Sequence, residues 1–272
     1  MIYKFIKSTV TVLTVNKVLS RSFSSYSKKC IKIYDFSYKP DNIYKEEVMD
    51  LMANSFISNE PMSKVLKISY KDSKTVFDLF KKENLVMQIA SENSLNTQEF
   101  SLPCKLPPII GAVFGMDLVD YSNMKFQLPE IFDPIGSIIS QLDNKLPYNT
   151  TSKGNILHAS ALATHPSYYG KNVGKNLYYS FLNKAKYLGY KYVVNEATSH
   201  ITQKMQHKIG AKVIAEVQYN DFLYNGKYVF KDITDTKGIQ LISLDLSEWQ
   251  YKSIDNIEKD LELIGDTNAV DI

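Results

Sequence analysis

The segment 164–177 carries residue types that suit the binding of a phosphate group. Its sequence, THPSYYGKNVGKNL, places Gly170 and Gly174 just before the apolar positions of a predicted helix. Glycine lets the backbone approach a ligand closely, and the N–H groups that open a helix lie at the positive end of its dipole without intrahelical partners. Lys171 and Lys175 add positive charge. The predicted chemistry is therefore binding of a pyrophosphate or a similar anion.

Two familiar nucleotide-binding motifs do not fit this segment. A Walker A loop has four residues between its glycines and a Ser or Thr after its lysine, but the spacing from Gly170 to Gly174 is one residue short and Asn176 follows Lys175. A Rossmann fingerprint needs another glycine spacing and an opening β-α-β unit. An ordinary strand-to-helix turn stays open as the alternative.

The segment resembles the acetyl-CoA loop of the GNAT acetyltransferase superfamily, in which Gln or Arg is followed by two residues, Gly, one residue, and Gly or Ala. Tyr169, Asn172 and Gly174 stand at these positions. Tyr169 leaves fewer donors near the phosphates, whereas Asn172 is a tolerable replacement because asparagine adopts the left-handed conformation at low cost. The resemblance implies acetyl-CoA as cosubstrate. The residues that it implies as contacts are Leu162, Ala163, Thr164, Tyr169, Gly170, Lys171, Asn172, Val173, Gly174 and Lys175.

Two further signatures resemble the insect-type arylalkylamine (dopamine) N-acetyltransferases. The Phe-x-x-x-Glu-Pro-Leu pattern of that group is matched by FISNEPM at 56–62, and its Ser-Ser-His-Tyr-Ser pattern by TSHIT at 198–202. The similarity covers about residues 30–246. It implies that Glu60 is the general base and that Thr198 and Thr202 form a proton relay.

Each implied role has a structural alternative. From the residues alone, Glu60 is an exposed carboxylate at a helix end, Thr198 caps a helix and Thr202 lies on the surface. His200 is a further candidate that packing would also explain. Many GNAT enzymes carry a tyrosine acid four residues before the glycine that ends this helix, but Gln206 stands there. Protonation of the leaving thiolate then falls to Thr202, water or a nearby tyrosine.

The segment 157–163 resembles the central strand of GNAT proteins, and this strand has a further implied role. In GNAT proteins a bulge in this strand presents a backbone N–H to the thioester oxygen, and Leu162 and Ala163 match these positions. An ordinary core strand is the alternative, and it is compatible because the role uses the backbone alone.

The amine is the least defined part of the sequence prediction. Aromatic residues make up 12% of the chain, enough to line an aromatic pocket, and favour a small arylalkylamine. Polyamines and protein or peptide amino termini stay open as substrates. A non-catalytic GNAT-like module that binds CoA also stays open, because of the departures at Tyr169, Asn172 and Gln206.

The resemblance implies an α/β (α+β) GNAT fold: a mixed, mostly antiparallel sheet between helices in three layers, α/β/α. The hydrophobic pattern predicts where its helices and strands lie. The first helix is expected to be capped by Asn42 and to end near 58–61. Further helices are expected at 73–82, 129–142, 173–188 and 198–209. Strands are expected at 31–36, 85–91, 109–118, 156–164, 190–194, 212–219 and 238–246.

The chain ends differ in charge from the middle. Residues 1–34 contain seven basic residues and no acid, and they are rich in Ser and Thr. This composition is typical of a mitochondrial presequence, and cleavage is expected after Phe23. A secretory signal or a basic tail with cytoplasmic location are the alternatives. The expected organisation is a presequence-like segment at 1–29, a GNAT domain at 30–246 and an acidic tail at 247–272 that is helical or disordered.

The composition of the chain limits the kinds of partner that it is expected to bind. The net charge of +3 is too small to indicate nucleic-acid binding, and no apolar run reaches the ~18 residues that span a bilayer. Cys30 and Cys104 fit no metal or redox spacing, and the four histidines form no metal motif, so no metal is expected. The expected state is a monomer that binds a small-molecule amine, with no nucleic acid and no membrane insertion.

Overall fold

The computed structural model describes residues 29–36, 44–82, 85–94, 108–124, 127–142, 145–253, 256–257 and 261. The predicted presequence, apart from residue 29, and the predicted cap Asn42 lie outside the described residues. Among the helices that are described, none is long and apolar enough to cross a membrane.

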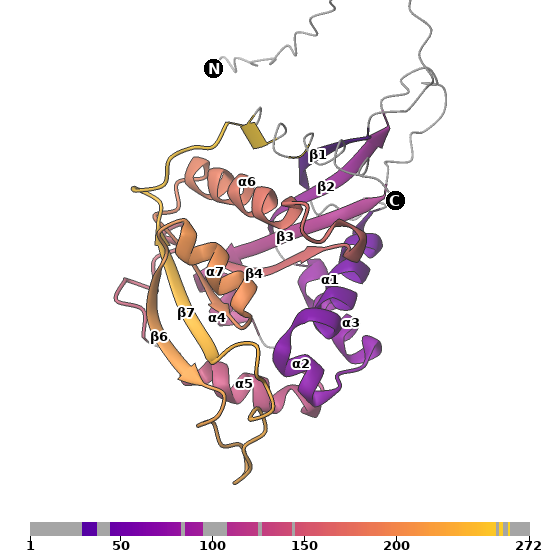
Figure 1. The fold of residues 1–272 in the computed structure, drawn as a ribbon. Helices are drawn as coiled ribbons and strands as arrows, with labels where there is room; N and C mark the ends of the chain where they lie inside the picture. Colours follow the sequence, from indigo (N-terminus) through magenta and orange to yellow (C-terminus); the bar gives the residue numbers. More distant parts are fainter. Residues whose placement is uncertain are drawn as a thin grey trace, which may run out of the picture.

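A seven-stranded sheet forms the middle layer in the order β1-β2-β3-β4-β5-β7-β6 (Figure 1). All neighbouring strands are antiparallel except β4 and β5, which are parallel. The prediction of a mixed, mostly antiparallel sheet is thus confirmed. The strands are β1 (Lys29–Phe36), β2 (Val86–Ser94), β3 (Ile109–Asp117), β4 (Ile156–Thr164), β5 (Tyr192–Ala197), β6 (Lys212–Gln218) and β7 (Gly238–Asp245).

The two central strands pair over only three residues. Residues 156–158 of β4 pair with 192–194 of β5, and beyond His158 no described strand lies on that edge of β4. The change coincides with a bulge: Gly115 of β3 pairs with Ala159 and Phe114 pairs with Ala161, so the register skips Ser160. A bulge bends its strand and increases the local twist. The polar backbone of residues 159–164 therefore faces a gap between β4 and β5.

Helices cover both faces of the sheet and complete the predicted three layers. Helix α6 (Val173–Tyr187) lies on one face, where it packs against β2, β3 and β4 (Figure 1). Helices α1 (Lys45–Asn59) and α3 (Tyr70–Leu79) lie on the opposite face, where α1 packs against β3 and β4 and α3 packs against α1. The spacing of Val48, Met52 and Phe56 predicts the inward face of α1.

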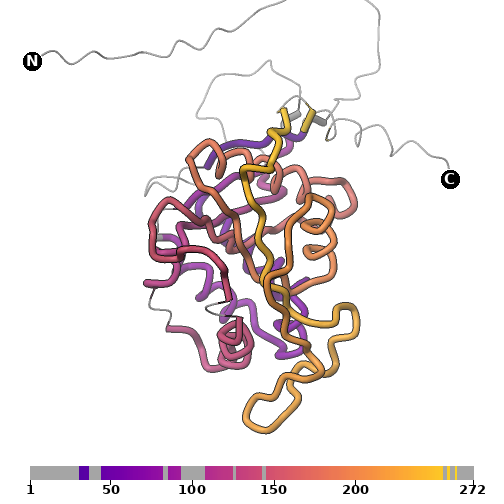
Figure 2. The backbone as a smooth tube through the Cα atoms, turned by 90° about the vertical axis from the view of Figure 1, so that its left-hand side faces the viewer, coloured from indigo at the N-terminus to yellow at the C-terminus, as the bar shows by residue number. Residues whose placement is uncertain are grey.

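A third apolar cluster closes the end of the sheet where β6 and β7 meet. It combines α2 (Pro61–Leu66), α5 (Asp133–Ser140) and the connection 219–237. Tyr219, Phe222 and Phe230 of that connection are buried and in ring contact. Figure 2 shows this connection extending beyond the sheet at the end that carries α5. One wall of the site described below is therefore built from parts distant in sequence.

The sequence did not predict two short helices, α2 and α4 (Leu118–Asn123). Each is six residues long, too short to show a helical period, and each begins at a local cap. Asp117 accepts a hydrogen bond from the Val119 N–H at the start of α4, so the strand ends at Asp117 instead of Leu118. Helix α7 (His200–Lys208) begins two residues later than predicted, because Ser199 is its cap and not Thr198.

Part of the acidic tail packs on the domain. Trp249, Ile257 and Leu261 are buried in the cluster that contains α6. The Trp249 indole N–H donates to the Asn183 side-chain oxygen at 3.0 Å. These three tail residues are thus part of the domain's core, whereas the other described tail residues are exposed.

Gly115 lies opposite the bulge, and we expect Gly115→Ala to destabilise the fold. A Cβ there would overlap the backbone carbonyl oxygen of His158, which cannot move without disturbing the bulge. Overpacking of this kind costs about 1–3 kcal/mol or more in free energy of unfolding. Gly136→Ala is the matched control, since Gly136 lies in α5 with open space around it, and alanine favours helix by up to about 1 kcal/mol. Equal unfolding midpoints for the two variants in urea would contradict this account.

Candidate active site

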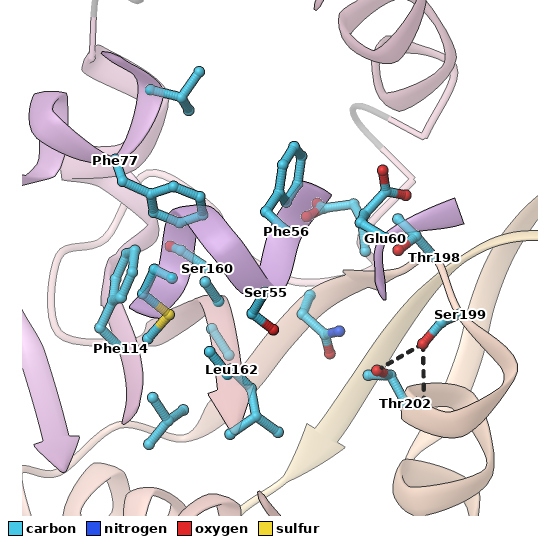
Figure 3. A pocket seen from close by; sticks show the side chains of 18 of the residues that line it. Ser55, Phe56, Glu60, Phe77, Phe114, Ser160, Leu162, Thr198, Ser199 and Thr202 are labelled. Carbon is cyan, nitrogen blue, oxygen red and sulfur yellow. Dashed lines mark hydrogen bonds between the residues drawn. The ribbon is translucent and has the colours of Figure 1, made fainter. Parts of the chain in front are cut away.

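A cavity of about 420 Å³ lies beside the gap between β4 and β5. One wall is apolar and is built largely of phenylalanine rings. The opposite wall carries Glu60, Thr198, Ser199 and Thr202, and β4 contributes Ser160 and Leu162 between the two walls (Figure 3). The main apolar side chains are Met52, Phe56, Phe77, Phe80, Phe114 and Phe132. The cavity thus joins an apolar chamber to a polar wall.

Glu60 occupies the break between α1 and α2. Its extended backbone ends α1, and Pro61 opens α2, where a missing N–H costs nothing. One carboxylate oxygen accepts from the Met62 N–H at 3.1 Å, and the other accepts from the Ser63 N–H at 2.6 Å and the Ser63 hydroxyl at 2.5 Å. The alternative of an exposed helix-end carboxylate is therefore wrong in part. Glu60 caps a helix, but it does so from the cavity wall.

Burial raises the pKa of Glu60 above its ordinary value of 4.5. The hydrogen bonds from Ser63 and Met62, together with Thr198 beside the carboxylate, oppose this effect without cancelling it. A carboxylate with a raised pKa is a stronger base than an exposed one, and it lies in a cavity that a ligand can enter. The geometry of Glu60 therefore suits proton transfer.

The predicted relay residues lie on the same wall. Thr198 precedes α7, and its backbone carbonyl accepts the Tyr219 hydroxyl at 2.9 Å. Thr202 lies in the first turn of α7, where its hydroxyl is 3.1 Å from that of Ser199. Both threonines line the cavity, so neither is a plain surface residue. His200 is exposed at the start of α7 and is not among the lining residues.

Leu162 and Ala163 lie on β4 beyond the bulge, and both line the cavity. In an antiparallel pair every second residue directs its N–H and C=O away from the partner strand. Alternate residues of 159–164 therefore direct these groups toward the gap, where no described strand accepts them. This edge has the polarity needed to bind a carbonyl oxygen or an extended amide-containing chain.

The predicted phosphate loop has the expected backbone. Asn172 is left-handed, with φ of 54°, and Gly170 has φ of 75°. The first intrahelical bond runs from the Asn176 N–H to the Asn172 carbonyl, so the Val173 and Gly174 amides belong to the open first turn of α6. The assignment of Asn172 to a left-handed position is confirmed.

Other side chains of the loop have specific contacts. Tyr169 is 47% exposed, and its hydroxyl accepts from the Asn59 side-chain amide at 2.6 Å. That bond links the loop to the residue before Glu60. The Lys171 ammonium lies 5.2 Å from the centre of the Tyr168 ring. A Cβ on Gly174 would lie 3.1 Å from the Thr164 hydroxyl, so this glycine allows close packing of α6 against the end of β4.

Sequence reasoning missed a buried pair of a histidine and a glutamate in the same cavity. His158 on β4 and Glu196 on β5 lie 2.8 Å apart between Nε2 and Oε2, and both line the cavity with Ser160. The histidines show no motif in sequence because the partner of His158 lies 38 residues away. The available signal was two polar residues, His158 and Ser160, inside the otherwise apolar strand ILHASALAT.

Gln206 is 2% exposed and lines the cavity. It stands where the sequence resemblance would place a tyrosine acid, and its amide has no proton to donate as an acid. Among the described residues, no group of three or more His, Cys, Asp and Glu side chains could hold a metal ion.

Several solved structures share this architecture, although no protein-family model matches the chain. The C-terminal condensation domain of Ebony, in complex with beta-alanyl-dopamine, superposes with a TM-score of 0.62 at 17% identity, over 79% of this chain and 98% of that one. Arylalkylamine N-acetyltransferase 2 from Aedes aegypti gives 0.59 at 16%, over 79% and 99%. The Drosophila melanogaster polyamine N-acetyltransferase, which forms N-acetylagmatine, gives 0.54 at 17%, over 79% and 99%.

These likenesses define the class of fold. The chain has the fold of GNAT-type N-acetyltransferases, including insect arylalkylamine N-acetyltransferases, as its sequence signatures predict. With identities of 14–17% in the arylalkylamine and polyamine enzymes, the likeness establishes architecture, and the chemistry has to be argued from this chain's own residues.

The raised pKa of Glu60 predicts a pH dependence of stability. The folded chain binds the Glu60 proton more tightly than the unfolded chain does, so this group adds stability as the pH falls from neutrality toward 4.5 and loses it as the pH rises. Glu60→Gln keeps the side-chain size but has no proton to take up. We expect the wild type to gain free energy of unfolding relative to Glu60→Gln between pH 7 and pH 5, measured in urea. A difference that stays constant with pH would contradict the assignment.

Proposed function

We propose that the chain is an acetyl-CoA-dependent N-acetyltransferase that acetylates a primary amine, with an arylalkylamine as the favoured class. The observation that carries the proposal is the gap between β4 and β5, which opens beside a cavity that contains a buried carboxylate. The gap offers backbone groups to an acyl thioester, and the cavity offers a base to an amine.

The residues around the gap fit acetyl-CoA. The open first turn of α6, with the left-handed Asn172 and nearby Lys171, suits the pyrophosphate. The unpaired edge of β4 suits the amide-containing arm, which would pair with this edge in the way that an added strand does. Bound there, acetyl-CoA supplies the acetyl group as a thioester. A backbone N–H at Leu162 or Ala163 would then polarise the thioester carbonyl.

Glu60 would accept the first proton from the amine. A protonated alkylamine has a pKa near that of lysine, about 10.4, so almost none is nucleophilic at neutral pH. The two oxygens of Glu60 are fixed by Ser63 and Met62, which holds the carboxylate on the cavity wall. Thr198 stands beside it, and Thr202 with Ser199 extends the line of hydroxyl groups along this wall.

The cavity favours an aromatic amine over a polyamine. Phe56 stacks with Phe132 at a centroid distance of 6.3 Å and meets Phe77 edge-on at 5.7 Å, which gives the chamber aromatic walls. A polyamine needs carboxylates for each ammonium group, but among the described residues the carboxylates that line the cavity are Glu60 and Glu196, and Glu196 is paired with His158. Neighbours of this fold act on both classes, since their names include arylalkylamine and polyamine N-acetyltransferases.

A non-catalytic CoA-binding module is the second candidate, favoured by Gln206 in place of the tyrosine acid. A protein or peptide N-acetyltransferase is a third. The test is release of the CoA thiol by the full chain with acetyl-CoA and a panel of phenethylamine, tryptamine, putrescine and an amino-terminal peptide. We expect turnover with the two arylalkylamines at the highest kcat/KM. Acetyl-CoA binding with no thiol release above buffer for any amine would instead support the non-catalytic module.

The catalytic role of Glu60 predicts a specific kinetic defect. Glu60→Gln retains the capping acceptor and removes the base, so kcat should fall by about 10² to 10⁴ while acetyl-CoA affinity is retained. The acidic limb of the pH–rate profile should change with it. Thr202→Ala should cost less, because water can replace a hydroxyl. Near-normal kcat for Glu60→Gln between pH 6 and 9 would reduce Glu60 to a helix cap.

A further inference from the structure

A buried chain of hydrogen bonds crosses the gap at its closed end. His158 is 3% exposed, and its Nε2 lies 2.8 Å from Oε2 of Glu196, while its Nδ1 lies 3.0 Å from the hydroxyl of Ser160. Tyr121 of α4 stacks on the imidazole, with 3.8 Å between ring centres and 22° between planes. The ring is therefore fixed in position, and Ser160 connects it to the cavity.

The hydrogen-bond partners determine which nitrogen carries the proton. Burial alone would raise the pKa of Glu196, but His158 outweighs this effect and the pKa is lowered, so Glu196 stays ionised. An ionised carboxylate only accepts, so the nitrogen that faces it, Nε2 of His158, is the donor of this hydrogen bond. In the tautomer that carries its hydrogen on Nε2, Nδ1 has a lone pair that can accept the Ser160 hydroxyl. The chain is thus oriented to receive a proton from the cavity through Ser160.

The proposed reaction has a proton that Glu60 does not handle. An ammonium group has three protons and the amide product keeps one, so two protons leave the nitrogen. One can go to Glu60 and then to solvent, and the other has to reach the leaving sulfur. Gln206 cannot supply it as an acid. Thr202, water and a cavity tyrosine are candidates for this step, and Ser160 with His158 is a further one.

We propose that Ser160, His158 and Glu196 form a proton relay that carries the second proton from the amine nitrogen to the leaving sulfur. The inference rests on the proposed function. As the carbon–nitrogen bond forms, the nitrogen proton passes to Ser160 while the Ser160 hydroxyl proton passes to Nδ1 of His158. The imidazolium that results lies against Glu196. As the carbon–sulfur bond breaks, Ser160 gives a proton to the sulfur and recovers one from His158.

In this scheme Ser160 touches the reacting atoms, and His158 and Glu196 act through it. The products are the amide, the CoA thiol and the one proton taken by Glu60, so the protons balance. The arrangement of a hydroxyl, an imidazole and a carboxylate within hydrogen-bond reach is the one that activates a hydroxyl for proton transfer.

Among the described residues that line the cavity, the charged and titratable groups besides His158 come from β5, α4, α6 and the break between α1 and α2. Glu196 of β5 is the charged group in contact with it, and Tyr121 of α4 stacks on it. Tyr178 of α6 and Glu60 also line the cavity, and burial raises the pKa of both. Tyr178 therefore stays neutral, and Glu60→Gln in parallel separates the contribution of the carboxylate from that of the imidazole.

The test compares His158 variants of the full chain, with acetyl-CoA and phenethylamine as substrates. His158→Gln should lower kcat by about 10² and change the shape of the pH–rate profile, with acetyl-CoA affinity retained. His207→Gln is the matched control, since His207 is exposed on α7 outside the cavity lining. Its kinetics should equal those of the wild type.

Chemical rescue separates proton transfer from packing. His158→Ala leaves a space that imidazole or pyrazole fills equally, but pyrazole is a far weaker base. We expect imidazole alone to restore kcat in His158→Ala, and neither compound to restore Glu60→Gln. Rescue by both compounds, or near-normal kcat in His158→Gln, would overturn the relay while leaving the acetyltransferase proposal intact. Absence of amine acetylation by the wild type would overturn both.

Discussion

The short pairing of β4 with β5 is the constraint on which the site depends. Three residue pairs hold these strands together, and the bulge at Ser160 then turns β4 away from β5. Gly115 allows the bulge, because any side chain there would meet the His158 carbonyl. If the strands paired along their full length, the backbone groups of residues 159–164 would form hydrogen bonds with β5 and the gap would be closed. The capacity to bind a ligand thus comes from hydrogen bonds that the sheet leaves unmade.

Glu60 combines a structural role with a position in the site. One carboxylate caps α2 through Ser63 and Met62, and it also faces the cavity. The cap fixes the carboxylate without a dedicated partner such as arginine, which would lower its pKa and weaken it as a base. Burial has the opposite effect and raises the pKa. The break between α1 and α2, which Pro61 enforces, therefore both places the group and tunes it.

The sequence predicts the strands and long helices well because their apolar periodicity is local. The left-handed position of Asn172 also follows from local chemistry, since asparagine tolerates that conformation. The pairing of His158 with Glu196 could not be predicted in this way, because it depends on which strands become neighbours in the sheet. The short helices α2 and α4 were not predicted for another reason: six residues are too few to show a helical period. The polar residues His158 and Ser160 inside the apolar strand β4 were the local sign of the His158–Glu196 pair.

Amide hydrogen exchange of the full chain, with and without CoA, tests most directly whether the unpaired edge of β4 is the ligand site. CoA avoids turnover and carries the same pyrophosphate and amide-containing arm as the acetylated form. The account predicts slower exchange on CoA binding for alternate amides of residues 159–164 and for the Val173 and Gly174 amides of α6, because these groups gain hydrogen-bond partners. Protection that appears elsewhere, with exchange in these two segments unchanged, would contradict it.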